Sequence, residues 1–263
     1  MEMFGIIIMG DLMKALITGA SSGIGRDMAR YLASQDFELF LVGRNREKLE
    51  SLQKELKVKS SVIIADLSDL TKVKELYILA KSFDIDVLIN NAGFGLFGKF
   101  YETDLNKELE MIRTNIEAVH LLTKLFLRDM KKRNSGYILN VASSAAFGPG
   151  PLMATYYATK AYVNNLTEAI NEELRRENSS VHVASLCPGP VDTNFNNVAG
   201  VRFSVKPLNS MEVSKYAIDK MFQGKVVIVP GMLMKLTLFF RRFASRKLIR
   251  KVTYNIQKSK DKE

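Results

Sequence analysis

Tyr156 and Lys160 are the residues of this chain whose types and spacing first suggest chemistry. They lie four positions apart in Tyr156-Tyr157-Ala158-Thr159-Lys160, so a helix there would place both side chains on one face. A free tyrosine has a pKa near ~10 and transfers protons poorly at neutral pH. A neighbouring ammonium group would favour the phenolate and lower that pKa. Because this spacing is common in helices, an interior tyrosine with a solvated lysine is the alternative.

A glycine-rich turn lies near the start of the chain. The apolar run 14–18 is followed by Gly19-Ala20-Ser21-Ser22-Gly23-Ile24-Gly25, and a segment of helical period continues to about residue 33. In a strand–turn–helix unit, such glycines permit a tight turn and let a pyrophosphate approach the helix N-terminus. We therefore expect a dinucleotide to bind here, and a purely structural turn is the alternative.

Arg44 bears on which dinucleotide would bind. The expected strand 38–42 is followed by Gly43-Arg44-Asn45-Arg46. In NAD-binding folds an acidic residue about 20 positions after the glycines bonds the ribose 2′-hydroxyl. A carboxylate would repel a 2′-phosphate, whereas an arginine would bind one. The sequence thus predicts NADP(H) in preference to NAD(H), and a solvated loop arginine is the alternative.

Strand-like and helix-like segments alternate along most of the chain. Such alternation is typical of βαβ units, in which a parallel sheet carries helices on both faces and binds ligands at the carboxyl ends of its strands. The further strands are expected at 61–65, 86–90, 136–141, 181–186 and 226–229, and the further helices at 47–56, 71–83, 105–132 and 156–176. We therefore predict a Rossmann-type, doubly wound parallel sheet of seven strands and a C-terminal helical tail.

Composition and charge exclude several classes of protein. The 263 residues are 47% hydrophobic and 25% charged, which is typical of a globular protein. The single cysteine, Cys187, excludes an internal disulfide and suits a reducing compartment, so we expect a cytoplasmic protein. With only two histidines, far apart, we expect no metal site.

The positive charge is confined to one end of the chain. Residues 231–263 contain ten Lys/Arg and two acidic residues, whereas the other 230 residues carry 28 basic and 26 acidic side chains. The body is therefore nearly neutral, and we expect no nucleic-acid partner. No segment reaches the ~20 apolar residues of a membrane span, and the apolar run 4–9 lacks the basic flank of a signal peptide. We expect an N-terminal extension (1–12), a catalytic domain (13–230) and a basic tail (231–263).

Together these segments resemble the short-chain dehydrogenase/reductase family, in its shorter one-domain branch, over roughly residues 14–230. Thr18 and the glycines after it match the cofactor motif of that branch, and Asn90-Asn91-Ala92-Gly93 matches its fourth-strand motif. The resemblance implies that the following residues bind the cofactor: Gly19, Ser21, Ser22, Gly23, Ile24, Gly25, Arg44, Asp66, Leu67, Asn91, Ala92, Gly93, Tyr156, Lys160, Pro188, Gly189, Val191 and Thr193.

The resemblance also implies a catalytic tetrad of Asn115, Ser143, Tyr156 and Lys160. The family's usual gap of 13 residues between the serine and the tyrosine selects Ser143 over Ser144 and Tyr156 over Tyr157. In the implied reaction, Tyr156 donates a proton to a carbonyl oxygen that Ser143 binds, while NADPH delivers hydride. Lys160 would lower the tyrosine pKa and hold the ribose, and Asn115 would position Lys160 through a water.

The sequence also favours a class of substrate, leaves a competing function open and suggests an oligomeric state. Apolar residues near the motifs favour a fatty or bulky ketone, as a free carbonyl compound or a 3-oxoacyl thioester, with ordinary core packing as the alternative. These residues are Phe94, Leu96, Phe97, Phe147, Leu152, Met153, Phe195, Val198, Val201 and Phe203. A cofactor-binding scaffold or redox sensor without turnover is the competing function. The resemblance implies a homodimer or homotetramer.

The basic tail (231–263) can be interpreted in two ways. Its apolar residues alternate with Lys and Arg in a pattern that predicts two amphipathic helices. Such helices could form a peripheral membrane contact through 231–263 or a lid over a lipid-like substrate. They could equally pack on the body or on an oligomer partner and leave a solvated basic face.

Overall fold

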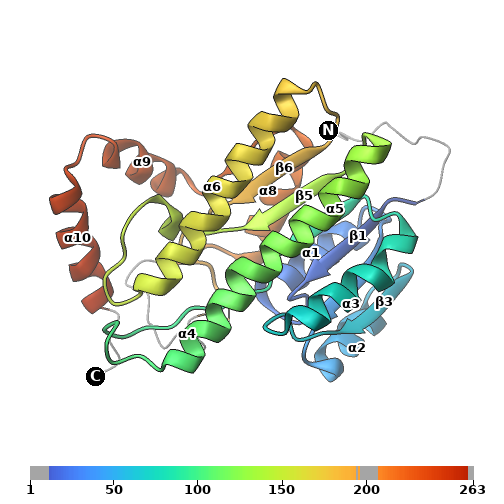
Figure 1. The fold of residues 1–263 in the computed structure, drawn as a ribbon, viewed down its shortest axis with the longest axis horizontal. Coiled ribbons are helices and arrows are strands. Elements are labelled where there is room, and N and C mark those ends of the chain that lie inside the picture. Colours follow the sequence, from blue (N-terminus) through green and yellow to red (C-terminus); the bar gives the residue numbers. More distant parts are fainter. Residues whose placement is uncertain (1–11, 194, 196–206, 260–263) are drawn as a thin grey trace.

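A seven-stranded parallel sheet forms the centre of the molecule (Figure 1). The computed structural model describes residues 12–193, 195 and 207–259. In chain order the strands are β1 (Lys14–Thr18), β2 (Glu38–Gly43), β3 (Ser60–Ile64), β4 (Val87–Asn90), β5 (Tyr137–Val141), β6 (His182–Leu186) and β7 (Val227–Ile228). Their spatial order is β3-β2-β1-β4-β5-β6-β7, so the chain winds outward from β1 in both directions. The predicted doubly wound Rossmann-type sheet is confirmed, and its switch point lies between β1 and β4.

The strands form because their sequences are apolar on both sides. Alternate residues of a strand point to opposite faces, and here both faces are covered. Leu16 of β1 packs with Phe40 and Leu88 on one face. Ile17 packs with Leu41 on the other face. Two cores, one on each side of the sheet, therefore hold the strand ends in fixed positions.

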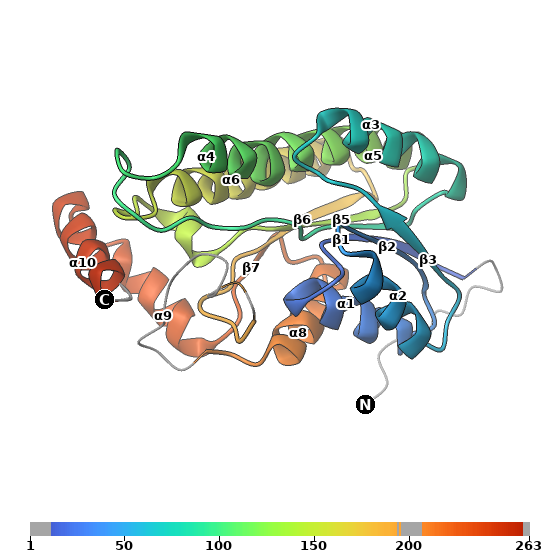
Figure 2. The same cartoon turned by 90° about the horizontal axis from the view of Figure 1, so that it is seen from below.

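Two layers of helices cover the sheet, as Figure 2 shows. One face carries α1 (Gly23–Ala33), α2 (Arg46–Glu55) and α8 (Ser210–Phe222), and the other carries α3 (Leu70–Ala80), α4 (Leu105–Ile112), α5 (Val119–Arg133) and α6 (Ala154–Arg176). Helix α8 was not predicted. Its start nevertheless has a sequence signal, because the Asn209 side chain accepts a hydrogen bond from the Glu212 amide at 3.1 Å, which is an N-cap.

The predicted continuous helix 105–132 was wrong in its middle. The segment η2 (Arg113–Ala118) has π-helical hydrogen bonding between α4 and α5, and Asn115 lies within it. Single π turns inside α-helices often occur at functional sites. Here the Asn115 side chain hydrogen-bonds the backbone of Phe94 instead of competing with its own helix. The widened turn therefore serves to present this asparagine to the loop after β4.

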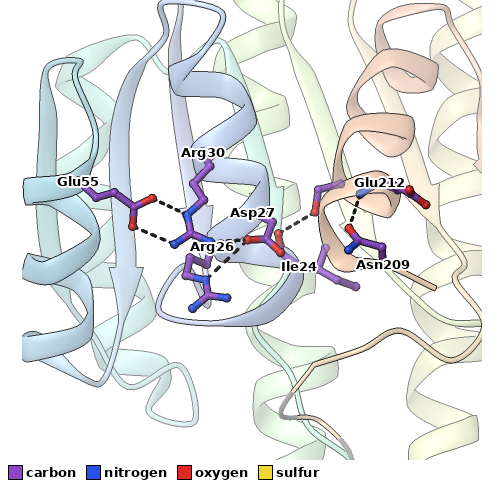
Figure 3. Close-up of polar contacts among 8 residues, drawn as sticks. Ile24, Arg26, Asp27, Arg30, Glu55, Asn209 and Glu212 are labelled. Atoms are coloured by element: carbon purple, nitrogen blue, oxygen red, sulfur yellow. Dashed lines mark hydrogen bonds and ion pairs between the residues drawn. The ribbon is translucent and has the colours of Figure 1, made fainter. Parts of the chain in front are cut away.

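Helix α1 is fixed by polar contacts with its neighbours (Figure 3). Arg30 forms an ion pair with Glu55 of α2 at 2.7 Å and a second one with Asp27 at 3.0 Å. On the other side, the Ser214 hydroxyl of α8 donates to the carbonyl of Ile24 at 3.1 Å. These contacts hold the N-terminus of α1, and with it the glycine turn, in one place.

The tail after residue 230 forms two further helices, α9 (Met232–Arg241) and α10 (Arg246–Lys258). They extend from one end of the molecule, beyond α4 and α6, in both views (Figures 1 and 2). Ser245 caps α10 by accepting a hydrogen bond from the Leu248 amide at 3.3 Å. Within the described ranges, no helix is both long and apolar enough to cross a bilayer. The expected division into an N-terminal extension (1–12), a catalytic domain (13–230) and a basic tail (231–263) stays a prediction.

Candidate active site and cofactor cleft

A cavity of about 440 Å³ lies at the carboxyl ends of the strands. It runs from the glycine turn to the start of α6 and ends at the tail helix α10. Most of the residues that we expected to bind the cofactor or perform catalysis line this cavity. They are Gly19, Ser21, Ser22, Gly23, Ile24, Arg44, Asp66, Leu67, Asn91, Ala92, Gly93, Ser143, Tyr156, Lys160, Pro188, Gly189, Val191 and Thr193. Gly25 and Asn115 lie behind this lining.

The glycine turn has a shape that larger residues would not allow. Gly19 has a φ of 66° and Gly23 a φ of 53°, which are left-handed conformations. A β-carbon on Gly25 would lie 2.5 Å from the carbonyl oxygen of Gly19 and would also collide with the Asn91 amide. Gly25 therefore acts by close packing inside the turn rather than at the cavity wall. The backbone at this wall stays free of side chains, as a bound pyrophosphate requires.

Thr18 and Asn91 join the ends of β1 and β4 beneath the cavity. The Thr18 hydroxyl accepts hydrogen bonds from the amides of Asn91 at 2.9 Å and Ala92 at 3.1 Å. The Asn91 side chain in turn donates to the carbonyl of Thr18 at 3.0 Å. These hydrogen bonds join β1 and β4 at the switch point of the sheet. They fix the backbone that lies beneath a bound cofactor.

Arg44 lies at the far end of the cavity among acidic groups. Its guanidinium is 3.1 Å from Glu110 and 3.8 Å from Asp66, and its side chain is 62% exposed. Burial raises the pKa of Asp66, but hydrogen bonds from Ser68 and the charge of Arg44 outweigh that effect, so the pKa lies below its ordinary value. Arg44 therefore lies at the cavity in an ion pair with Glu110. A bound 2′-phosphate would compete with Glu110 for the guanidinium.

Tyr156 is buried beside Ser143, but its pKa shifts opposite to our expectation. Burial raises the pKa of Tyr156 well above its ordinary value, and the hydrogen bond with Ser143 lowers it by less. Lys160 is not among the groups that shift this pKa, although its ammonium lies over the Tyr156 ring, 5.9 Å from the ring centroid. The prediction that Lys160 lowers the pKa of Tyr156 was therefore wrong, because burial raises that pKa. The phenol is held in its protonated form.

Lys160 is itself buried under the same wall of the cavity. Its ammonium donates a hydrogen bond to the carbonyl of Val141 at the end of β5, at 2.8 Å. Burial lowers the pKa of Lys160 to about 8. The lysine is thus held in place by the sheet and has a charge that changes near physiological pH.

Asn115 connects the π turn to the loop after β4. It is fully buried, donates to the Phe94 carbonyl at 2.9 Å and to the Thr159 hydroxyl at 3.1 Å, and accepts from the Phe94 amide at 3.1 Å. Gly93 lies between Asn115 and Lys160, since a β-carbon there would be 2.8 Å from the Asn115 oxygen and 3.4 Å from the Lys160 nitrogen. The structure therefore brings the four tetrad residues to one end of the cavity.

The apolar residues expected in a substrate pocket divide into four groups. Phe94, Met153 and Phe195 line the cavity, and Phe195 lies 5.4 Å from Tyr156 between ring centroids. Leu96 and Phe97 pack in the same cluster as Met153 and Tyr156. Phe147 belongs to a different cluster, with Val163 and Cys187, and Leu152 is absent from the cavity wall. The remaining three, Val198, Val201 and Phe203, lie outside the described residues.

Two polar residues of the cavity wall were not singled out from the sequence. Tyr157 lines the cavity beside Tyr156 and accepts a hydrogen bond from the Gln257 amide of α10 at 2.6 Å. Gln257 is 1% exposed, and its side-chain oxygen has no partner within the described part of the chain. The two residues are 100 positions apart, so no local pattern links them. The tail therefore completes the cavity wall.

The residues at this cavity fit a nicotinamide dinucleotide. The bare glycine turn provides space and backbone amides for phosphates. The buried lysine and the protonated tyrosine lie at the other end, where a nicotinamide and its ribose would be placed. The arrangement can bind a dinucleotide and pass a proton to a group beside it.

Comparisons with known proteins agree with this geometry. A family model described as short chain dehydrogenase matches residues 13–201. An uncharacterized oxidoreductase of Staphylococcus epidermidis is 32% identical over 210 residues, which cover 78% of this chain and 90% of that protein. A very-long-chain 3-oxoacyl-CoA reductase of Laccaria bicolor is 35% identical over 175 residues, which cover 64% of this chain and 52% of that protein.

Solved structures extend the similarity to nearly the whole fold. A short-chain dehydrogenase from Sphingobium yanoikuyae in complex with NADPH has a TM-score of 0.80 at 27% identity, covering 90% of this chain and 95% of that one. A short-chain dehydrogenase/reductase from Burkholderia phymatum in complex with NAD has a TM-score of 0.81 at 25% identity, covering 91% and 96%. Both the family match and the fold lead to one assignment. The chain belongs to the short-chain dehydrogenase/reductase family.

Proposed function

We propose that this protein is an NADP(H)-dependent oxidoreductase that interconverts an apolar ketone or aldehyde and the corresponding alcohol. The observation that carries the proposal is the meeting of Tyr156, Ser143 and Lys160 at one end of a cavity whose other end is the glycine turn. A bound nicotinamide cofactor would supply the hydride. The side chains described here would supply the proton, the binding of the carbonyl oxygen and the correct orientation.

Tyr156 is the proton donor of this proposal. Its raised pKa keeps the phenol protonated in the free protein, which is the form that can donate to a carbonyl oxygen. Ser143 shares a hydrogen bond with Tyr156, and its hydroxyl can bond the same carbonyl oxygen as charge develops there. The proton would move from the Tyr156 oxygen to the substrate oxygen, where negative charge develops during reduction.

Lys160 and Asn115 support this proton transfer. The Lys160 ammonium, anchored on the Val141 carbonyl, would hold a bound cofactor in place beside Tyr156. Its two remaining hydrogens are available to ribose hydroxyls. Asn115 acts as a positioning residue, because its bonds to Phe94 and Thr159 fix the loop and the helix that flank Lys160. Its oxygen accepts one bond and retains a lone pair for a water.

The pKa of Lys160 predicts a pH dependence. Since burial lowers this pKa to about 8, the amine loses its charge as pH rises through that value. We expect kcat/KM for NADPH, which reports the free enzyme, to fall above about pH 8 and to approach a tenfold loss per pH unit. The measurement is a pH profile from about pH 6.5 to about 9.5 at a saturating ketone concentration. A profile that stays flat over this range would exclude Lys160 as a required cation.

The apolar part of the wall supports a bulky or fatty substrate. Phe94, Met153 and Phe195 flank Tyr156, so a carbonyl placed at its oxygen would have its substituents against these side chains. The similarity to a very-long-chain 3-oxoacyl-CoA reductase also favours 3-oxoacyl thioesters as candidates beside free ketones. A panel of bulky ketones, long-chain aldehydes and 3-oxoacyl thioesters, followed by the loss of NADPH absorbance, tests this proposal. If NADPH binds but no carbonyl is reduced and no alcohol oxidised, the enzyme assignment fails in favour of a scaffold.

Gln257 is expected to contribute to substrate binding. Its side-chain oxygen is buried at the cavity wall and has no partner among the described residues, and such an acceptor is costly to leave unpaired. We expect Gln257→Ala to raise KM for the best ketone about tenfold while leaving the Kd of NADPH unchanged. Gln35→Ala, on the exposed turn after α1, is the matched control. An unchanged KM, or an equal change in the control, would show that Gln257 only packs.

A further inference from the structure

Helix α9 presents a row of large apolar side chains to the solvent. At spacings of one, three and four residues they fall on one stripe of the helix, which is the pattern of an amphipathic face. Their exposed fractions lie between 48% and 77%, for Met232, Leu233, Leu236, Phe239, Phe240 and Phe243. The three aromatic rings form one group, since Phe239 lies 5.5 Å from Phe240 and 5.6 Å from Phe243 between ring centroids. Apolar patches of this kind on a protein surface usually mark an interaction site.

This stripe is distinct from the face by which α9 packs on the body. Met234 lies against Gly189, where a β-carbon would come 2.7 Å from its terminal methyl group. Arg241, two turns further along, lies against Gly148 of the loop before α6. Lys235 donates a hydrogen bond to the Tyr216 hydroxyl at 3.0 Å. Because the body already occupies this face, the exposed stripe is not the part of α9 that holds the tail in place.

Helix α10, like α9, has one face that is exposed and one face that contacts the body. Leu248, Val252 and Ile256 recur every four residues and are each about half exposed, between 46% and 51%. The neighbouring face carries Gln257 into the cavity wall. The tail helices thus have one face that contacts the body, mostly through polar side chains, and an apolar face that is exposed.

The charge of the tail indicates what could cover this surface. Residues 231–259 contain eight Lys/Arg and no acidic residue. In the described part of the chain, none of these eight forms an ion pair, whereas the basic residues of the body are often paired. A second copy of the same surface would bring like charges together, which opposes association. An anionic surface with an apolar interior fits both the charge and the stripe.

We propose that α9 and α10 bind the surface of a bilayer rich in anionic lipids. The apolar stripe of α9 would enter the boundary between headgroups and acyl chains, while Arg242, Arg246, Lys247, Arg250 and Lys251 lie near lipid phosphates. The position of both helices at one end of the molecule leaves them accessible to a flat surface (Figures 1 and 2). The inference does not depend on the reaction proposed above. Because α10 also lines the cavity, this binding would bring the substrate end close to the lipid.

The test is co-sedimentation of the full chain with vesicles of phosphatidylcholine alone and with about a third phosphatidylserine. We expect binding to the anionic vesicles only, and weaker binding as salt is raised. The triple variant Phe239→Ser/Phe240→Ser/Phe243→Ser and the pair Arg250→Glu/Lys251→Glu should each lower the partition coefficient about tenfold or more. Retained NADPH binding by each variant shows that its fold is intact.

Matched controls carry equivalent changes elsewhere. Ile78→Ser/Leu79→Ser removes two exposed apolar residues of α3, at the opposite end of the molecule (Figure 1). Lys54→Glu/Lys57→Glu reverses two exposed charges at and beyond the end of α2. Both should bind vesicles as the unaltered chain does. The proposal is overturned if the unaltered chain does not sediment with anionic vesicles, or if the controls lose as much binding as the tail variants. It is likewise overturned if the phenylalanine variant turns a dimer into a monomer without changing vesicle binding.

Discussion

Tyr156→Phe is expected to lower the rate of NADPH-dependent ketone reduction about 10²- to 10⁴-fold. The change removes one oxygen, which shares a hydrogen bond with Ser143 and is the proton donor of the proposed reaction. The ring stays, and with it the packing against Phe195 at 5.4 Å between centroids, so the fold and the Kd of NADPH should be unchanged. Steady-state kinetics and a fluorescence titration with NADPH measure the two quantities separately.

Tyr157→Phe is the matched control for this experiment. Tyr157 also lines the cavity, but its hydroxyl is engaged with Gln257 and it does not share the hydrogen bond with Ser143. We expect its loss to change kcat by no more than a few-fold. Turnover that survives in Tyr156→Phe and disappears in Tyr157→Phe would reverse the assignment of the two tyrosines. Turnover that survives in both would remove the phenol from the mechanism.

Arg44→Asp should reverse the preference between NADPH and NADH. The guanidinium is the cationic group expected beside the 2′-phosphate, and a carboxylate in its place would repel that phosphate and accept a bond from a free 2′-hydroxyl. We expect the ratio of kcat/KM for NADPH to that for NADH to fall about 10²- to 10³-fold, because a charge-assisted bond is lost and a repulsion is gained. An unchanged ratio would mean that Arg44 does not contact the cofactor.

Glu110→Gln is expected to shift the cofactor preference in the opposite direction, toward NADPH. Glu110 holds Arg44 at 3.1 Å and would also repel a 2′-phosphate. Removing its charge while keeping its shape should therefore strengthen NADPH binding a few-fold and leave NADH binding nearly unaltered. If NADPH binding weakens instead, Glu110 orients Arg44 for the phosphate rather than competing for it.

The sheet could be predicted from local sequence because its signals are local. Runs such as Ala15–Leu16–Ile17 are apolar on both faces, which in a βαβ chain indicates a buried parallel strand. The alternation of such runs with helical periods then determines the topology, since the connections are right-handed and the motifs fall at one edge. The glycine turn was predictable for the same reason, as only glycine adopts its backbone conformation without strain.

Other features depend on contacts between distant segments, which no local pattern records. The π turn at Asn115 exists because that side chain bonds to Phe94, 21 residues away. Gln257 is linked to the cavity wall by its hydrogen bond to Tyr157 of α6, 100 residues away. The pKa of Tyr156 is decided by its burial, and the spacing to Lys160 contains no information on burial. The cytoplasmic location and the homodimer or homotetramer stay predictions.

The most direct measurement follows a labelled hydride from NADPH that carries deuterium in both positions at the nicotinamide C4. The protein is incubated with this cofactor and its best ketone, and the alcohol is examined by mass spectrometry and NMR. The account predicts one deuterium on the carbinol carbon of the product, formed by the unaltered chain and about 10²-fold or more slowly by Tyr156→Phe. An alcohol without deuterium at that carbon, or no alcohol at all while NADPH is bound, would contradict it.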